Sequence, residues 1–253
     1  MTELADGIII SPDGKTVTGF NKGKSRGKAV IHIPSGVERI DDYAFFGVKI
    51  DSLYIPKELE YLGKYTLRDE DFLEGYFEGP YCLFVKKVRK IEVEEGSRHF
   101  FCDGRALYSA YNGGKRLEYV IDDKITEYAA PCDLKCIPHP SLANCFDLER
   151  VILTEGFEEF DECALEPCSI VKEVFLPKSV KNLRIKKMEG GVEGWNTVCY
   201  RVDEKNEKFF TDGDSLYEVL EDGTYKLLKN QYFGKGETEI PEGVSIIGER
   251  AFE

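Results

Sequence analysis

The chain has 253 residues, of which 42% are hydrophobic, enough to bury a sizeable core in either two globular domains or one elongated array. Its 47 acidic residues outnumber the 34 basic ones, and the resulting formal charge of -13 repels phosphate groups. Nucleic acid and anionic membranes are therefore poor candidate partners, and we interpret the acidity as a feature that keeps a long surface soluble.

The sequence shows no segment for membrane insertion or export. No run approaches the roughly 18 apolar residues of a transmembrane segment, and residues 1–7 lack the basic start and apolar core of a signal peptide. Eight cysteines are too few for a small disulfide scaffold, so we expect reduced thiols. These features slightly favour the cytoplasm, and the alternative is a secreted or cell-surface protein from which a leader has been removed.

The first predicted element is a β-hairpin over residues 6–20. Two β-prone runs flank Asp13 and Gly14, and an Asp-Gly pair tolerates the positive φ angles of a tight turn. The same pattern returns at residues 103–120 and 212–228, each time after a short lead-in that ends in two phenylalanines. The sequence therefore predicts three inserted hairpins.

A short apolar phrase follows the first hairpin and predicts one coil of a repeat. Residues 31–33 read as a very short strand, which Pro34 ends because proline cannot donate to a ladder, and Gly36 permits the sharp corner that follows. Apolar residues from Ile40 to Phe45 then recur at helical spacing and predict one helical turn against the core. A weaker copy of this phrase begins at Leu53.

The clearest repeat joins residues 145–153 to residues 168–176. Every Cys and aliphatic position of the first stretch recurs in the second at an offset of 23 residues. A period near 23 with short aliphatic phrases is typical of a solenoid, in which each coil covers the apolar edge of its neighbour. Residues 68–87 and 183–199 follow no repeat, and we expect them to form long loops.

The chain ends in a close copy of the first coil. Residues 239–252 match residues 32–45 at an offset of 207. No polar cap follows this copy, whereas a terminal repeat normally needs one. We therefore expect either a fragment of a longer array or an end that is covered by a partner.

These phrases resemble the BspA-type leucine-rich repeat, whose consensus has an apolar strand, then Ile-Pro, Gly-Val, Ile-Gly and Ala-Phe, and a Cys before the next coil. Residues 240–252 carry the four pairs almost letter for letter, and Cys145 and Cys168 hold the Cys position. The lead-in and hairpin of residues 202–217 are also similar to that family. The resemblance covers nearly the whole chain, with departures such as Thr66-Leu67 in place of Ala-Phe.

The predicted fold is an α/β repeat solenoid. We expect a single leucine-rich-repeat domain over residues 1–253, wound as a right-handed superhelix with short strands on its concave face and with the three hairpins inserted. The outward side chains of those strands would line the concave face, and exposed apolar or aromatic groups on a rigid ribbon suit partner binding. The candidate partner-binding residues are His32, Tyr54, Glu92, Ile152, Phe175 and Glu239.

The sequence supports metal-binding and catalytic motifs far less than it supports the repeats. Cys132, Cys136, His139 and Cys145 have roughly the ligand types of a structural zinc site, but repeat packing already explains Cys132 and Cys145. None of the three histidines lies in a nucleophile or metal motif. We therefore predict no catalytic residue, no metal and no cofactor.

The resemblance implies a binding role, because such families are similar to adhesins and other ligand-binding surface proteins of bacteria and protists. We predict a non-enzymatic module that recognises a protein or a glycan of unknown identity. One alternative is an intracellular scaffold or a regulatory interaction domain of a larger protein. Another is an enzyme whose active residues lie in the unassigned loops, for instance near Trp195, since a fold by itself does not fix a function.

Overall fold

The structure is a computed structural model of the whole chain. It describes residues 1–24, 27, 29–63, 66–67, 88–138, 141–142, 145–165, 170–185, 198–231, 239–249 and 251–252. Two units can be distinguished: the first contains residues 1–123 and 141–145, and the second contains residues 124–140 and 146–253. The expectation of a single domain over residues 1–253 stays a prediction.

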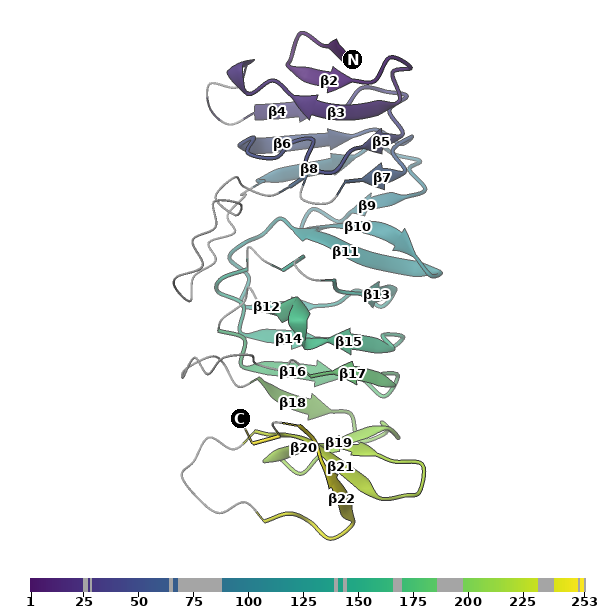
Figure 1. Cartoon of the computed structure of the whole chain (residues 1–253), viewed down its shortest axis with the longest axis vertical. Coiled ribbons are helices and arrows are strands. Elements are labelled where there is room, and N and C mark those ends of the chain that lie inside the picture. The colour runs from purple at the N-terminus through teal and green to yellow at the C-terminus, as the bar shows by residue number, and fades with distance from the viewer. Residues whose placement is uncertain are drawn as a thin grey trace. The chain divides into compact units, whose positions relative to one another are not determined.

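The first unit is built almost entirely from short strands (Figure 1). One sheet has the order β1-β2-β3-β5-β7, a second has the all-parallel order β4-β6-β8, and β9, β10 and β11 form an antiparallel meander. Its elements are β1 (Thr2–Glu3), β2 (Ile8–Ile10), β3 (Thr16–Phe20), η1 (Lys22–Lys24), β4 (Ala29–His32), β5 (Arg39–Ile40), β6 (Ile50–Ile55), β7 (Tyr61–Leu62), β8 (Lys90–Val93), β9 (Phe100–Cys102), β10 (Ala106–Tyr111) and β11 (Gly114–Val120).

Each of the first two coils of the first unit contributes one strand to each of two parallel ladders. The first coil gives β4 and then β5, and the next gives β6 and then β7, so β6 pairs with β4 and β7 pairs with β5. Side chains alternate along a strand, so Ile31, Leu53 and Ile91 face inward in register and are at most 3% exposed. The core of this unit lies between the two ladders.

The helical turn expected over residues 40–45 is not found. Ile40 ends β5, and the following residues form hydrogen-bonded turns in which Ala44 N donates to Asp41 O and Phe46 N donates to Tyr43 O. Tyr43 has a φ angle of 62°, in the left-handed region, which a right-handed helix excludes. The described residues contain strands and two short 3-10 helices but no α-helix, so the helical part of the predicted α/β class is absent from them.

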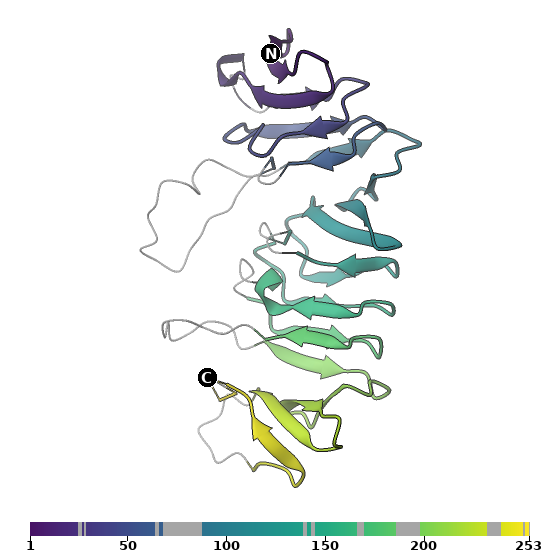
Figure 2. The ribbon, with the colours of Figure 1, turned by 45° about the vertical axis from the view of Figure 1, so that its right-hand side comes forward.

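The second unit repeats the same plan (Figure 2). One parallel sheet has the order β12-β14-β16-β18, a second pairs β15 with β17, and the antiparallel strands β19, β20 and β21 are joined by β22, which runs parallel to β21. Its elements are β12 (Glu127–Ala129), β13 (Leu134–Cys136), β14 (Arg150–Ile152), β15 (Glu159–Asp161), η3 (Glu162–Leu165), β16 (Glu173–Leu176), β17 (Asn182–Arg184), β18 (Cys199–Val202), β19 (Phe209–Thr211), β20 (Ser215–Val219), β21 (Tyr225–Asn230) and β22 (Val244–Ile247).

The period of 23 residues is confirmed by strand register. Val151 pairs with Val174, and both are fully buried. Polar contacts follow the same period: Lys172 Nζ lies 2.9 Å from Glu149 Oε1, and Asn182 Nδ2 donates to Glu159 Oε1 at 3.2 Å. A residue and its counterpart one coil later are therefore direct neighbours across the ladder.

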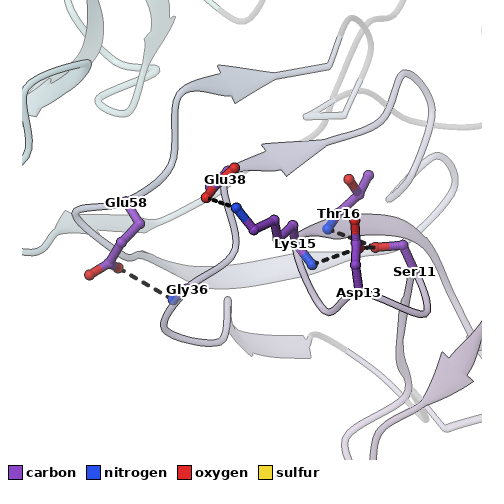
Figure 3. Close-up of polar contacts among 7 residues, drawn as sticks. All are labelled: Ser11, Asp13, Lys15, Thr16, Gly36, Glu38 and Glu58. Atoms are coloured by element: carbon purple, nitrogen blue, oxygen red, sulfur yellow. Dashed lines mark hydrogen bonds and ion pairs between the residues drawn. The ribbon is translucent and has the colours of Figure 1, made fainter.

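The same contact links successive turns of the first unit (Figure 3). Lys15 Nζ, in the hairpin turn, lies 2.6 Å from Glu38 Oε1, 23 residues later. Gly36 N, at the following corner, donates to Glu58 Oε2 at 3.5 Å. Successive turns are therefore linked by polar contacts at the exposed edge as well as by the packing of their apolar side chains in the core.

The three predicted hairpins are confirmed as the antiparallel pairs β2–β3, β10–β11 and β20–β21. At the tip of the second hairpin, Asn112 and Gly113 have φ angles of 45° and 74°, the two left-handed residues that a tight hairpin turn requires. Residues 68–87 lie outside the described residues. Of the stretch 183–199, residues 183–184 complete β17 and Cys199 begins β18, while residues 186–197, with Trp195, lie outside the described residues.

Candidate functional site

Three of the six candidate residues form one row across the parallel sheet of the first unit. His32 on β4 is opposite Tyr54 on β6, and Tyr54 is opposite Glu92 on β8. His32 and Glu92 are exposed and Tyr54 is half-buried. The rings of His32 and Tyr54 stack with their centroids 4.1 Å apart and an angle of 4° between their planes. Both rings are therefore held face to face on the outer side of the sheet.

Lys90 lies beside this row, two residues before Glu92 on β8 and opposite Ser52 on β6. Its ammonium donates to Tyr54 Oη at 3.4 Å, lies 5.3 Å from the Tyr54 ring centroid and forms a 2.6 Å ion pair with Glu92. The Glu92 carboxylate and, after it, the Tyr54 hydroxyl raise the pKa of Lys90 above its ordinary value. The row thus joins two stacked rings to a cation and a carboxylate. We name His32, Tyr54, Lys90 and Glu92 the aromatic row.

Ile152 and Phe175 form the corresponding row in the second unit. They are directly opposite each other on β14 and β16, and the row continues to Ala129 on β12 and to Arg201 on β18. Ile152 and Phe175 are half-buried, while Ala129 and Arg201 are exposed. We name these four residues the apolar row, since three of its members carry no polar side-chain atom.

Glu127, Arg150 and Glu173 form a charged row beside the apolar row, two residues earlier on β12, β14 and β16. Glu127 and Arg150 form an ion pair of 2.5 Å, and Glu173 forms one of 2.9 Å with Arg201 of the apolar row. Sequence reasoning missed Arg150 and Arg201. The 23-residue period contains the signal, because it aligns Glu127, Arg150 and Glu173 with alternating charge.

Glu239 is exposed and is not part of a strand, and residues 232–238 before it lie outside the described residues. Its place on a concave strand therefore stays a prediction. The next strand, β22, begins at Val244, after a corner at Pro241 and Gly243 in which Gly243 has a φ angle of 94°. The other five candidates lie on parallel strands, in two rows, one in each unit.

The alternative zinc site falls partly outside the described residues, because His139 is among those not described. Within the part of the chain that the structure describes, no three His, Cys, Asp or Glu side chains are grouped as metal ligands. Cys145 is fully buried, as expected for the repeat Cys position, whereas Cys132 is exposed. Over the same residues, no helix is both long and apolar enough to cross a bilayer.

Short parallel strands that recur every 23 residues, with one apolar face buried between two ladders, define a leucine-rich-repeat fold. The family model of the BspA type leucine rich repeat region matches residues 24–76 and 121–189 in six copies. These residues are BspA-type leucine-rich repeats, as their Ile-Pro, Gly-Val and Cys positions predicted.

Solved structures of bacterial leucine-rich-repeat proteins are similar to this chain. A leucine rich cell surface protein from Faecalibacterium prausnitzii matches with a TM-score of 0.52 and 17% identity, over 96% of this chain and 65% of that one. A leucine-rich repeat protein from Eubacterium ventriosum matches with a TM-score of 0.43 and 17% identity, over 61% of this chain and 37% of that one. The pneumococcal vaccine antigen PcpA matches with a TM-score of 0.41 and 24% identity, over 58% and 33%.

The first of these similarities supports the fold alone, because its identity is low. The chain spans less than two thirds of the length of each of these three proteins. No curated protein matches the chain.

Proposed function

We propose that this protein is a non-enzymatic binding module that recognises a protein or a glycan through the outward faces of its parallel strands. Those faces would form the concave side of a right-handed solenoid that runs through the whole chain. The observation that carries the proposal is the pair of rows, in which aromatic and aliphatic side chains occupy successive strands and lie in register.

The aromatic row is suited to binding because its rings are fixed before a partner arrives. Tyr54 stacks on the His32 ring and its hydroxyl accepts a hydrogen bond from the Lys90 ammonium, so its rotamer is restricted. A side chain that is already immobile loses little conformational entropy when it is covered, and binding energy is then not spent on ordering it. The exposed His32 ring offers a partner an aromatic surface. Lys90 and Glu92 add a cation and a carboxylate, both of which can form hydrogen bonds with a partner.

The apolar row offers surface that a partner can remove from water. Phe175 and Ile152 stay half-buried on a regular sheet and are flanked by the charged pair Glu173–Arg201. An apolar centre with a charged rim is the usual arrangement of a recognition surface, in which the centre gives affinity and the rim gives orientation.

A binding experiment with matched variants tests this proposal. The full chain, immobilised, is exposed to a glycan array and to extracts of surface and cytoplasmic proteins, and each captured partner is then titrated against Tyr54→Ala/Phe175→Ala. Removing two central aromatic anchors is expected to weaken binding at least tenfold, because such residues typically contribute more than 1 kcal/mol each.

The control is Tyr43→Ala/Tyr111→Ala, which removes two exposed tyrosines that lie outside the parallel strands. This variant should bind as well as the original protein. A partner that is captured equally by the original protein and by the Tyr54→Ala/Phe175→Ala variant would rule out the two rows as its binding site.

The alternative function, an intracellular scaffold, is favoured by one observation. No disulfide joins the six cysteines that the structure describes, among them the exposed Cys132, and unpaired cysteines of this kind are expected in a reducing compartment. Localisation of the native protein with an antibody separates the two: a cytoplasmic signal supports the scaffold, and a surface signal supports adhesion.

A further inference from the structure

An aspartate or asparagine is followed directly by glycine six times in this chain. Five of these pairs contain aspartate, and the sixth is Asn112-Gly113, at the tip of the hairpin formed by β10 and β11. In all six the glycine has a positive φ angle, between 74° and 102°. Such a pair contains both partners of one intramolecular reaction, because the glycine nitrogen can attack the side-chain carbonyl carbon of the preceding residue and no Cβ blocks its approach.

Both reacting groups are hydrogen-bonded in each of the five Asp-Gly pairs. Every glycine amide donates to a residue two or three positions earlier: Gly7 to Leu4 O, Gly14 to Ser11 O, Gly104 to Cys102 Sγ, Gly213 to Thr211 Oγ1 and Gly223 to Leu220 O. Every carboxylate accepts from the backbone amide two residues later, at 2.8 to 3.2 Å: Asp6 from Ile8, Asp13 from Lys15, Asp103 from Arg105, Asp212 from Asp214 and Asp222 from Thr224. These bonds hold nucleophile and side chain in place.

The pair Asn112-Gly113 lacks both restraints. Among the residues that the structure describes, neither the Asn112 side-chain amide nor the Gly113 nitrogen takes part in a hydrogen bond. Both residues are exposed, and a Cβ built on Gly113 would meet no atom within 4 Å. The turn is closed only by the pairing of Tyr111 with Gly114 on either side of it. Opening such an exposed tip costs little free energy.

We propose that Asn112-Gly113 is a site of spontaneous covalent modification, at which water converts Asn112 to aspartate and isoaspartate. The Gly113 amide loses its proton to a solvent base, and its nitrogen attacks Asn112 Cγ. A C–N bond forms, the bond from Cγ to Nδ2 breaks, and Nδ2 takes a proton from water and leaves as ammonia. The product is a cyclic succinimide. The neutral amide of asparagine accepts this attack far more readily than the ionised carboxylate of an aspartate.

Water then opens the succinimide at either of its carbonyl carbons. Addition at Cγ restores the original main chain and gives aspartate. Addition at the main-chain carbonyl carbon of residue 112 gives isoaspartate, in which the main chain runs through Cβ and Cγ. Over both steps one water is consumed and one ammonia is released, and no oxidant or reductant is needed.

The two products alter the hairpin tip differently. Both add a carboxylate, which takes the formal charge from -13 to -14. Aspartate tolerates the left-handed conformation that Asn112 adopts, so the turn is kept. Isoaspartate adds a carbon atom to the main chain of a two-residue turn, so Tyr111 and Gly114 can no longer pair as they do. We therefore expect the exposed end of this hairpin to fray only after isoaspartate forms.

Incubation of the full chain between neutral and mildly alkaline pH tests the proposal. Trypsin cleaves after Arg105 and Lys115, so the peptide of residues 106–115 carries Asn112 as its only asparagine. Chromatography and mass spectrometry then separate the original peptide from its aspartate and isoaspartate forms. Both products should accumulate, and faster at higher pH because the Gly113 nitrogen must lose its proton. An Asn112 that stays intact would overturn the proposal.

Other asparagines of the same sample are internal controls. The side chains of Asn21, Asn182 and Asn230 each donate to another side chain, and none of the three precedes a glycine. They should remain asparagine over the period in which Asn112 is converted. Conversion at any of them as fast as at Asn112 would contradict the assignment of the site.

Asp222→Asn is the matched variant, because it places a second Asn-Gly pair in the third hairpin. There the Gly223 amide donates to Leu220 O at 3.0 Å, and Thr224 N can still donate to the side-chain oxygen of residue 222. For each pair, the rate in the folded chain is divided by the rate in urea, which removes the influence of the neighbouring residues. This ratio should be about tenfold lower at position 222, equivalent to about 1.4 kcal/mol of protection. Equal ratios would overturn the proposal, since the unrestrained tip would then give Asn112 no advantage.

Discussion

Lys229 Nζ lies 2.6 Å from Glu162 Oε1, and the two side chains are only 11% and 8% exposed. The pair joins β21 of the third hairpin to η3 of a coil, 67 residues earlier in the chain. The Lys229 ammonium also lies 5.7 Å from the ring centroid of Tyr200. Burial, followed by the nearby Glu162 carboxylate, raises the pKa of Tyr200 well above its ordinary value, so the phenol stays neutral beside the pair at neutral pH.

Breaking this ion pair on one side should destabilise the second unit strongly. Lys229→Met leaves the Glu162 carboxylate buried without its cation, and such a loss costs about 3 to 5 kcal/mol. The double variant Glu162→Leu/Lys229→Met removes both charges and should recover most of that stability. Urea unfolding of the two single variants and the double variant measures the coupling. A double variant no more stable than the worse single variant would contradict this account.

Asn206 should be more important for stability than its counterpart in the other lead-in. Its side chain, 9% exposed, donates to Pro177 O at 2.8 Å and Val180 O at 3.1 Å, and accepts from the amides of Lys208 and Phe209 at 2.9 and 2.8 Å. Asn206→Ala removes all four hydrogen bonds. Pro177 O keeps the Val180 amide as a donor, at 3.2 Å, but the other three backbone groups lose their Asn206 partner. Because each such group costs about 1 to 3 kcal/mol and some will relax, we expect a total loss of about 2 to 4 kcal/mol.

Ser97 provides the control for Asn206, because it occupies the same position of the second hairpin's lead-in. The Ser97 hydroxyl accepts one hydrogen bond, from Phe100 N at 3.2 Å. Ser97→Ala should therefore cost about 1 kcal/mol or less. Chemical unfolding of both variants gives the comparison, and similar losses would show that the four contacts of Asn206 do not stabilise the lead-in as proposed.

Asp13 should titrate below the ordinary range of an aspartate. The Ser11 hydroxyl at 2.5 Å and, after it, the Lys15 amide at 3.1 Å donate to Asp13 Oδ1 and lower the pKa of this carboxyl (Figure 3). A carboxyl whose pKa is lower in the folded than in the unfolded chain stabilises the fold above its unfolded pKa of about 3.9. That contribution is lost as the pH falls through the lowered folded pKa.

An NMR titration of the side-chain carboxyl measures this effect directly. Ser11→Ala should move the pKa of Asp13 upward toward its ordinary value, because the largest cause of the shift is removed. Asp222, whose pKa is lowered chiefly by the Thr224 hydroxyl in another hairpin, should not respond. An unchanged Asp13 titration in the Ser11→Ala variant would contradict the assigned cause.

Local repetition made much of the fold predictable. The offset of 23 residues placed Val151 beside Val174, and the Asp-Gly and Asn-Gly pairs located the hairpin turns. Alternation along a short strand was sufficient to place Tyr54 on the outer face and Leu53 in the core. These features depend on residues that are neighbours in the chain or one repeat period apart, so a single sequence is sufficient to predict them.

The features that the sequence did not predict depend on backbone conformations and long-range contacts that the repeat period does not define. The helical spacing of residues 40–45 was genuine, but Tyr43 adopts a left-handed conformation that the spacing does not reveal. The pair of Glu162 and Lys229 joins a coil to a hairpin across 67 residues, and no local pattern marks it.

Gly63 should be intolerant of even one added methyl group, because successive coils meet there. A Cβ at this position would lie 2.3 Å from both the carbonyl carbon and the carbonyl oxygen of Asp41, which is backbone and cannot rotate away. Gly63→Ala should therefore force the second coil away from the first and cost about 1 to 3 kcal/mol, as overpacking in a core does. Gly19→Ala is the matched control in the same unit, since its Cβ would meet nothing closer than Ile9 Cδ1 at 3.8 Å. Thermal and urea unfolding compare the two, and the prediction fails if Gly63→Ala is as stable as Gly19→Ala. The physical reason is general: a leucine-rich repeat stacks its coils through backbone as well as side chains, so the glycine after the second apolar strand position sets how closely two coils approach.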